Sequence, residues 1–229
     1  MIMSMSYDNV LERLKEERRA RNWSQDQISQ KLKMSQSHYS KVELGNRRFT
    51  YYEVQDLYEL ELDAHYIFTG QKSGKQEEAF FSKCDYKELH FYLHVLAYMA
   101  EYFYVVRKSE DWKAVYKELE YIKYVTAPDR TDDNTLFLLR RMLNYSQQTM
   151  AEKLGVDVKK VRTMENGESL PDSEILWKLY DLFRIPPAVF TGNQNGMLSA
   201  FCCLLDILVN ENREHALEVL ESCHGVIAG

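Results

Sequence analysis

Apolar residues recur every three or four positions along most of the chain, which is the spacing of amphipathic α-helices. The first such segment covers residues 9–21. Ser24 and Gln27 then have the spacing of a capping box, which predicts a second helix that ends near Lys33. Ser35 is the predicted N-cap of a third helix. The pattern predicts an all-α protein.

The third predicted helix covers residues 36–44 and ends at Gly45, and a fourth begins near Tyr51. A short fifth element contains residues 66–68. The same series follows later in the chain, and further helices come after each series. The helices of the second series are predicted at 134–143, 146–154, 158–166 and 172–183, followed by a turn that Pro186 and Pro187 open. Extensions over 77–106 and 112–124 follow the first series, and extensions over 197–209 and 213–222 follow the second.

The two series are copies of one unit. Residues 23–70 align with residues 145–192 without a gap at a fixed offset of 122, and twelve of the 48 aligned positions are identical. Such a repeat indicates one supersecondary unit that is used twice. The expected organisation is a first domain at 8–70, an aromatic-rich helical connection at 71–131, a second domain at 132–192 and a helical tail at 193–229.

The charge is unevenly distributed along this otherwise ordinary globular composition, in which 45% of the 229 residues are hydrophobic and 28% are charged. The net charge of −6 by itself disfavours a nucleic-acid partner. Residues 11–48, however, carry ten Lys or Arg against five Asp or Glu, and residues 140–162 carry six against two. Because salt screens charges beyond about 10 Å, these local excesses decide what each copy attracts.

Several functional classes are disfavoured. Residues 1–7 lack the features of a signal peptide, and the apolar stretches 91–106 and 197–209 are too short or too interrupted to span a bilayer. The four cysteines have no CxxC spacing, which favours free thiols in a reducing compartment, so we expect a cytoplasmic protein. We also expect no cofactor. Since no catalytic Ser-His-Asp order, phosphate-binding loop or carboxylate dyad is present, we expect no enzyme.

The predicted helix at 36–44 has two different faces. Tyr39 and Val42 point one way, toward the two preceding helices, and four polar residues point the other way. Two short helices joined by a tight turn, the second with a free polar face, form the pattern of a helix-turn-helix. The polar four are Gln36, Ser37, Ser40 and Lys41; in the second copy Val161 and Met164 face inward, and Val158, Lys159, Arg162 and Thr163 face outward.

Both copies resemble the Cro/C1-type helix-turn-helix family, whose pattern is approximately LSQ-x3-A-x-KLGV-x5-I-x-x-x-E-x-G. The matching strings are WSQDQISQKLKMSQSHYSKVELG and YSQQTMAEKLGVDVKKVRTMENG. The resemblance implies a repressor-like transcriptional regulator that inserts helix three into the major groove of double-stranded DNA. Two modules in one chain would then read two half-sites about 34 Å apart.

The resemblance also implies roles for individual residues. Base contacts fall to Gln36, Ser37 and Lys41, whose side chains suit adenine, several bases and guanine respectively. Gln25 and Gln147, each at the start of helix two of its copy, would contact phosphates. The base-reading positions of the second copy are Val158, Lys159 and Thr163.

After helix three, the resemblance assigns DNA-backbone contacts to Asn46, Arg47 and Arg48. Their counterparts in the second copy lack the charge for this role, so the first copy is the stronger predicted reader. Those counterparts are Glu168, Ser169 and Leu170.

The first copy departs from the family pattern at two positions. Ser29 replaces the usual alanine, a small change. Lys33 replaces the usual turn glycine and must therefore adopt a strained or different turn conformation.

Two Arg–Glu pairs recur at the repeat offset: Arg18 with Glu43, and Arg140 with Glu165. In the resembled family this pair is largely an internal ion pair that ties helix one to helix three, so we predict a structural role. A phosphate contact from Arg18 stays open as an addition.

Residues 80–124 are crowded with aromatic side chains, which suit a core, a dimer interface or an effector pocket. We expect a core and a homodimer interface, because the chain has more apolar surface than two small modules need to cover. A pocket for a small-molecule or peptide effector is the alternative. His90 and His94 lie four residues apart with Cys84 nearby, but without a second ligand cluster the expected role is packing, with no metal.

The competing functional class is a protein-interaction or ligand-sensing scaffold, in which one or both modules no longer bind DNA. The basic, polar face of the first copy argues against a complete loss. Glu168 and Leu170 make a loss credible in the second copy.

Overall fold

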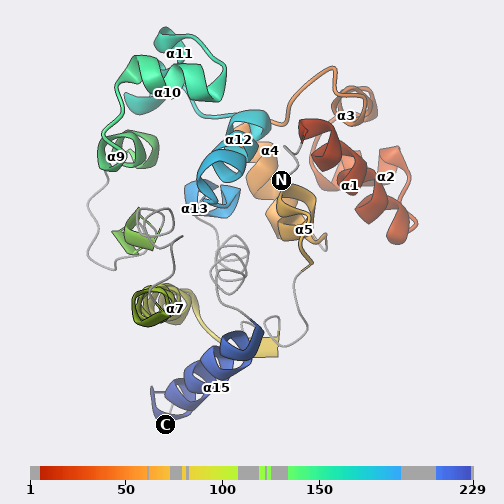
Figure 1. Cartoon of the computed structure of the whole chain (residues 1–229). Coiled ribbons are helices and arrows are strands. Elements are labelled where there is room, and N and C mark those ends of the chain that lie inside the picture. The colour runs from red at the N-terminus through yellow and green to blue at the C-terminus, as the bar shows by residue number, and fades with distance from the viewer. Residues whose placement is uncertain are drawn as a thin grey trace.

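The computed structural model describes residues 6–60, 62–72, 79–80, 83–107, 119–121, 123–124, 134–191 and 210–227. These residues form α-helices joined by turns, with no β-strand among them, as the sequence predicted (Figure 1). The helix predicted at 197–209 and most of the one at 112–124 lie outside the described residues. Within the described ranges, no helix combines the length and apolar character needed to cross a membrane.

The first copy contains five consecutive helices, each with a side chain at its N-cap that accepts a hydrogen bond from a backbone N–H of the first turn. The predicted capping box of Ser24 and Gln27 is present. The helices are α1 (Tyr7–Ala20), α2 (Gln25–Lys31), α3 (Gln36–Glu43), α4 (Tyr51–Glu59) and α5 (Ala64–Thr69).

The second copy repeats this series close to the predicted bounds. Asn134, Ser146, Asp157 and Asp172 cap its first four helices. The helices are α9 (Thr135–Met142), α10 (Gln147–Leu154), α11 (Val158–Glu165), α12 (Ser173–Phe183) and α13 (Pro187–Thr191).

The repeat extends to the backbone conformation of the turns. Asn22 and Asn144 end the first helix of each copy with φ of 56° and 55°. In the turn of the helix-turn-helix, Lys33 has φ of 54° where Gly155 has 65°. The unusual turn conformation predicted for Lys33 is thus confirmed, because a residue with a Cβ occupies the left-handed region there.

The copies differ at their starts. By the repeat offset, Tyr7 corresponds to position 129, yet α9 begins only at Thr135, where Asn134 accepts from two backbone N–H groups and donates to the carbonyl of Met164 at 2.8 Å. The longer start of α1 brings Tyr7 to the second copy. Its hydroxyl lies 2.6 Å from Ser173 Oγ, with either oxygen able to donate.

The two copies are joined directly through the segment after α3 and the start of α12. Phe49 N–H donates to Ser173 Oγ at 3.1 Å, and Ser173 N–H donates to the Phe49 carbonyl at 3.0 Å. Arg48 Nε donates to Glu174 Oε2 at 2.6 Å. We call this set of five residues, Tyr7, Arg48, Phe49, Ser173 and Glu174, the inter-copy joint.

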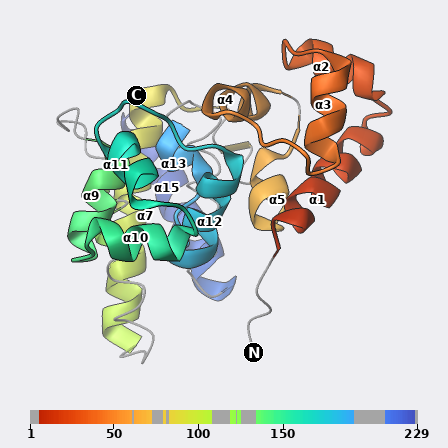
Figure 2. The same cartoon turned by 90° about the horizontal axis from the view of Figure 1, so that it is seen from above.

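A second contact joins α4 to α13. The Tyr51 hydroxyl donates to the Phe190 carbonyl at 2.6 Å, and the Gln55 amide donates to the Thr191 carbonyl at 2.7 Å. In both views α4, α5, α12 and α13 lie between α1–α3 of the first copy and α9–α11 of the second (Figures 1 and 2). Buried residues of both copies belong to one continuous apolar core. The tandem modules therefore pack as one unit.

The helices α7 (Tyr86–Arg107) and α15 (Asn210–Ile227) form a second core at the end of the molecule away from α3 and α11 (Figure 1). The single helix predicted over 77–106 is wrong in its first part. Residues 83–85 are not helical, because Asp85 and Glu88 form a capping box that starts α7 anew. Leu93, Leu96 and Leu220 are fully buried in this second core.

Candidate nucleic-acid interface

The helix α3 presents the polar face that the sequence predicted. Gln36, Ser37 and Lys41 are exposed and Ser40 is half-buried. The opposite face is anchored: Tyr39 and Val42 have no solvent exposure. Burial of these apolar side chains holds α3 against α1 and α2 and fixes the direction of its polar face.

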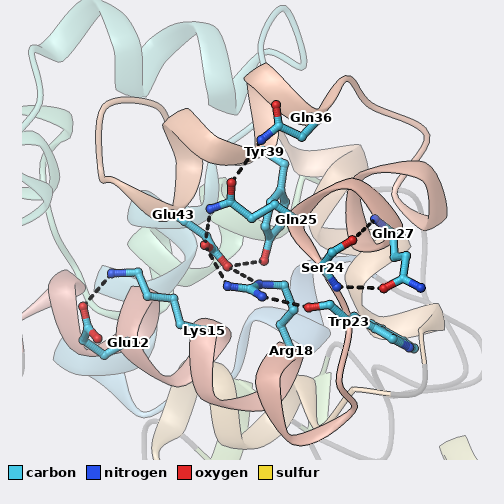
Figure 3. Close-up of polar contacts among 10 residues, drawn as sticks. All are labelled: Glu12, Lys15, Arg18, Trp23, Ser24, Gln25, Gln27, Gln36, Tyr39 and Glu43. Atoms are coloured by element: carbon cyan, nitrogen blue, oxygen red, sulfur yellow. Dashed lines mark hydrogen bonds and ion pairs between the residues drawn. The ribbon is translucent and has the colours of Figure 1, made fainter.

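A buried carboxylate ties the module together (Figure 3). Arg18 donates to both oxygens of Glu43, at 2.7 and 3.2 Å, and Gln25 and Tyr39 donate at 2.7 and 2.8 Å. Burial alone would raise the pKa of Glu43, but the hydrogen bonds from its three donors outweigh this and hold the pKa below its ordinary value. Arg18 also donates to the carbonyl of Trp23 at 2.8 Å. The end of α1, the start of α2 and the end of α3 thus meet at one charge.

Gln25 connects this buried carboxylate to the exposed face. Its Nε2 donates to Glu43, and its Oε1 accepts from Gln36 Nε2 at 3.1 Å (Figure 3). The Gln25 amide is therefore engaged within the protein, and one consequence is that it orients a predicted base-reading side chain. The resemblance alone implied only a phosphate contact for this residue.

The three residues assigned to the DNA backbone after α3 differ in placement. Asn46 and Arg47 are exposed. Arg48 is in the inter-copy joint: besides Glu174 it donates to the carbonyl of Gly45 at 2.6 Å, and its guanidinium lies 4.7 Å from the ring centroid of Tyr7. The guanidinium of Arg48 is thus bound to protein groups, whereas the side chains of Asn46 and Arg47 are exposed to solvent.

The second copy builds the same frame. Arg140 donates to Glu165 at 2.5 and 3.0 Å, and Gln147 donates to Glu165 at 2.8 Å. The position of Tyr39 is taken by Val161, which has no hydroxyl to donate. Glu165 therefore lacks the counterpart of the hydrogen bond that Glu43 accepts from the Tyr39 hydroxyl.

The outward residues of α11 are less free than those of α3. Lys159 and Arg162 are exposed, but Val158 and Thr163 are half-buried. The Thr163 hydroxyl donates to the carbonyl of Lys160 at 3.0 Å and lies 2.9 Å from the hydroxyl of Ser169. At the position of Lys41, the second copy therefore has a hydroxyl that is already bonded to the protein.

The inter-copy joint was not found by sequence reasoning. Glu174 lies in the first turn of α12, and its carboxylate is bound by Arg48 and by Lys178. Burial would raise the pKa of Glu174, but these two cations hold it below its ordinary value. The only signal in the sequence is that Glu174 stands where the first copy has Tyr52, and a single acidic residue in a first helical turn is too common to indicate a contact.

This arrangement, with two anchored helix-turn-helix units that each present a polar helix, defines a DNA-binding regulator. A helix-turn-helix family model matches residues 14–57 and 136–190. Both copies belong to the Cro/C1-type helix-turn-helix family, which is a DNA-binding family and not one of enzymes. Neither a curated protein nor a solved structure gives a significant match to the chain.

Proposed function

We propose that the protein is a sequence-specific, cytoplasmic, repressor-like transcriptional regulator that inserts α3 into the major groove of its operator. The observation that carries the proposal is the exposed face of Gln36, Ser37 and Lys41 on a helix whose opposite face is completely buried. Amides pair well with adenine and ammonium groups with guanine, so this face suits base edges. Repression would follow from occupancy of the operator, without chemistry.

The proposed phosphate contacts come from the region after α3. Asn46 and Arg47 are exposed there, and the N-terminal copy has a local excess of basic residues. Phosphate contacts set the register of a protein on DNA, while base contacts specify the sequence. Arg48 has a different role in this proposal, since its guanidinium is bound in the inter-copy joint.

The two modules would act as an internal pair. Single-module relatives need a dimer to read two half-sites, whereas here one chain contains both modules and a continuous core between them. The helices α3 and α11 lie at the same end of the molecule, opposite α7 and α15 (Figures 1 and 2). We propose that they read two unlike half-sites about one helical turn, ~34 Å, apart.

A selection of bound sequences from random double-stranded DNA tests the central proposal. The expected outcome is an asymmetric site with one strongly specified half, read by the first copy. The control is the Gln36→Ala, Lys41→Ala double variant, which changes two exposed side chains and should fold normally. Enrichment of no sequence by the unaltered chain, at low and at moderate salt, would reject DNA reading.

A second experiment tests the internal pair. About five base pairs, half a helical turn, are inserted between the two selected half-sites. If the joint fixes the spacing, the unaltered chain should lose roughly 100-fold or more in affinity, because the second module can no longer add to the first. A chain with Arg48→Gln should lose less. Equal affinity for both spacings would reject the internal pair while leaving reading by α3 intact.

A protein-interaction scaffold is the second candidate, and one observation at the second copy favours it. Leu170, at the position of Arg48, is 41% exposed. With Pro171 and Tyr51 it lines a cavity of about 140 Å³ between the copies. A cavity with a mainly apolar lining and a few polar groups suits a protein or small-molecule partner better than a phosphate. The selection described above separates the two candidates, since a scaffold enriches no sequence.

A further inference from the structure

The residues that lead into α7, its first turn and the last turns of α15 bring together three donor groups from two distant parts of the sequence. A thiol, a carboxylate and an imidazole meet there, from Cys84, Glu88 and His224, and their donor atoms all lie within 4.8 Å of one another. Among the described residues, this is the one place where three or more His, Cys, Asp or Glu side chains bring their donor atoms this close together. The helices α7 and α15 lie at the end of the molecule away from α3 and α11 (Figure 1).

Each donor is held by a neighbour outside the group. One oxygen of Glu88, Oε2, accepts from the backbone N–H of Asp85 at 2.7 Å, which leaves Oε1 directed at the imidazole, 3.6 Å from His224 Nδ1. The Cys84 thiol is buried and makes a 3.5 Å contact with the carbonyl of Phe80. The bond from Asp85 N–H to Glu88 is of the kind that orients ligand carboxylates at metal sites in proteins. The Cys84 proton leaves to solvent when the sulfur binds a metal as thiolate.

The imidazole is also oriented by packing. The ring of His224 lies edge-on to Phe80 and tilted against Tyr92, at centroid distances of 6.2 and 6.1 Å. The Tyr92 hydroxyl lies 3.3 Å from Nδ1. Two aromatic rings therefore hold the imidazole at the thiol and the carboxylate.

We propose that Cys84, Glu88 and His224 bind one zinc ion. Thiolate, imidazole and carboxylate are the donors that zinc takes in proteins, and donors around a tetrahedral zinc stand roughly 3–4 Å apart. A small rotation of these side chains brings groups already within 4.8 Å to that separation. Water fills the fourth position.

The site has a path to solvent and a structural consequence. The side chains of Glu88 and His224 are 23% and 19% exposed, so an ion can enter without unfolding the helices. Because Cys84 lies just before α7, Glu88 in its first turn and His224 near the end of α15, the ion ties the C-terminal helix to the connection between the two copies. This proposal is independent of DNA binding.

Titration of the full chain with zinc chloride, after removal of metals with a chelator and under a thiol-free reductant, tests the site. Isothermal calorimetry should give one zinc per chain. Cys84→Ser and His224→Gln should each weaken zinc binding by roughly 100-fold or more, as the loss of a metal ligand must exceed the 10–100-fold cost of losing a supporting contact. Zinc should raise the melting temperature of the unaltered chain but not that of these two variants.

The chain offers matched controls for both variants. Cys223→Ser removes the thiol next to His224, and His215→Gln removes an exposed imidazole from the same helix. Neither should change zinc affinity by more than about twofold. Absence of stoichiometric binding, or equal losses in the control variants, would overturn the proposal.

A cobalt measurement decides the case even if the ligand variants fold poorly. Cobalt(II) bound to a thiolate in a tetrahedral site gives an intense sulfur-to-metal absorption and visible bands. The unaltered chain should show both at one equivalent of cobalt, and zinc should remove them. If the chain takes up cobalt without the sulfur band, Cys84 is not a ligand and the proposal is wrong.

Discussion

Glu43 is the residue whose buried carboxylate connects three helices of the first module. It is 3% exposed and accepts hydrogen bonds from Arg18, Gln25 and Tyr39. Removing one partner of a buried pair leaves the other charge without compensation, which costs about 3–5 kcal/mol. One residue thus holds three helices and, through Gln25, one base-reading side chain.

Glu43→Ala should lower the melting temperature without DNA, because it leaves Arg18 partly buried and uncompensated. We expect a loss of about 3 kcal/mol in the free energy of unfolding, measured by denaturant titration. Glu12→Ala is the control, since Glu12 makes only a surface pair with Lys15 (Figure 3). If both variants melt like the unaltered chain, the buried pair has no structural role.

The same carboxylate predicts a pH dependence. The pKa of Glu43 is lowered in the folded state, as is that of Glu174. A lowered pKa contributes stability that is complete above the ordinary carboxyl range, roughly pH 4–5, and is lost as the pH falls through the folded-state value. Glu43→Gln should be less stable at neutral pH and lose less stability on acidification. Parallel curves of stability against pH for the two chains would contradict this.

At the scale of the element, the turn between α2 and α3 carries a strain that its repeat avoids. Lys33 has a positive φ, and Gly155 stands at the same point of the second copy. The Lys33 side chain is 74% exposed, so its ion pair with Asp56 contributes little. The first module is therefore open to stabilisation at this turn.

Lys33→Gly should stabilise the chain by about 0.5 kcal/mol, since relief of the left-handed strain exceeds the added freedom of glycine in the unfolded chain. Lys33→Ala removes the same ammonium group without relieving the strain and should give no gain. In the second copy, Gly155→Ala should lower the free energy of unfolding by about 1 kcal/mol, because alanine is strained at this positive φ. The close approach of the new Cβ to Lys178 Nζ, 3.3 Å, adds to this loss. Denaturant titration of the three variants checks the order.

The two reading helices are expected to contribute unequally. Lys41 is exposed on α3, whereas Thr163, its counterpart on α11, is bonded to Lys160 and Ser169. On one selected operator, Lys41→Ala should weaken specific binding by about 1–3 kcal/mol, and Thr163→Ala by much less. Equal losses, measured by fluorescence anisotropy at fixed salt, would reject the asymmetry.

At the scale of the whole molecule, the copies are modules in sequence but not separate bodies in space. The inter-copy joint and the contact between α4 and α13 join them through backbone and side-chain hydrogen bonds. The predicted boundaries at 8–70 and 132–192 remain predictions. Because the core is continuous, we expect both modules to unfold in one transition.

The homodimer expected from the sequence stays a prediction, and α7 is the helix that we expect to form its interface. Phe91, Tyr98 and Tyr102 are 47%, 54% and 66% exposed and share one side of α7 by their spacing. An exposed aromatic stripe of this kind is typical of an isologous interface. Light scattering at micromolar concentration should give twice the 27.1 kDa mass of one chain. The double variant Tyr98→Glu, Tyr102→Glu should have the mass of a single chain. A monomer before substitution would contradict the dimer.

The sequence alone determined the repeat, the helices of the two copies and the faces of α3 and α11. These features are local: caps, apolar spacing and turn residues act within a few positions, so Ser24 with Gln27, or Tyr39 with Val42, can be interpreted without the rest of the chain. The family resemblance, carried by the same positions, is shown for both copies.

Only the tertiary structure decided which charges are engaged between the two copies and at the end of the molecule formed by α7 and α15. Arg48 and Glu174 are 126 residues apart in the chain, and Cys84 and His224 are 140 apart. Nothing in local spacing brings such residues together, because their contact depends on how whole helices pack. The polar face of each module was therefore predictable, whereas the joint that orients the two modules and the donor group between α7 and α15 were not.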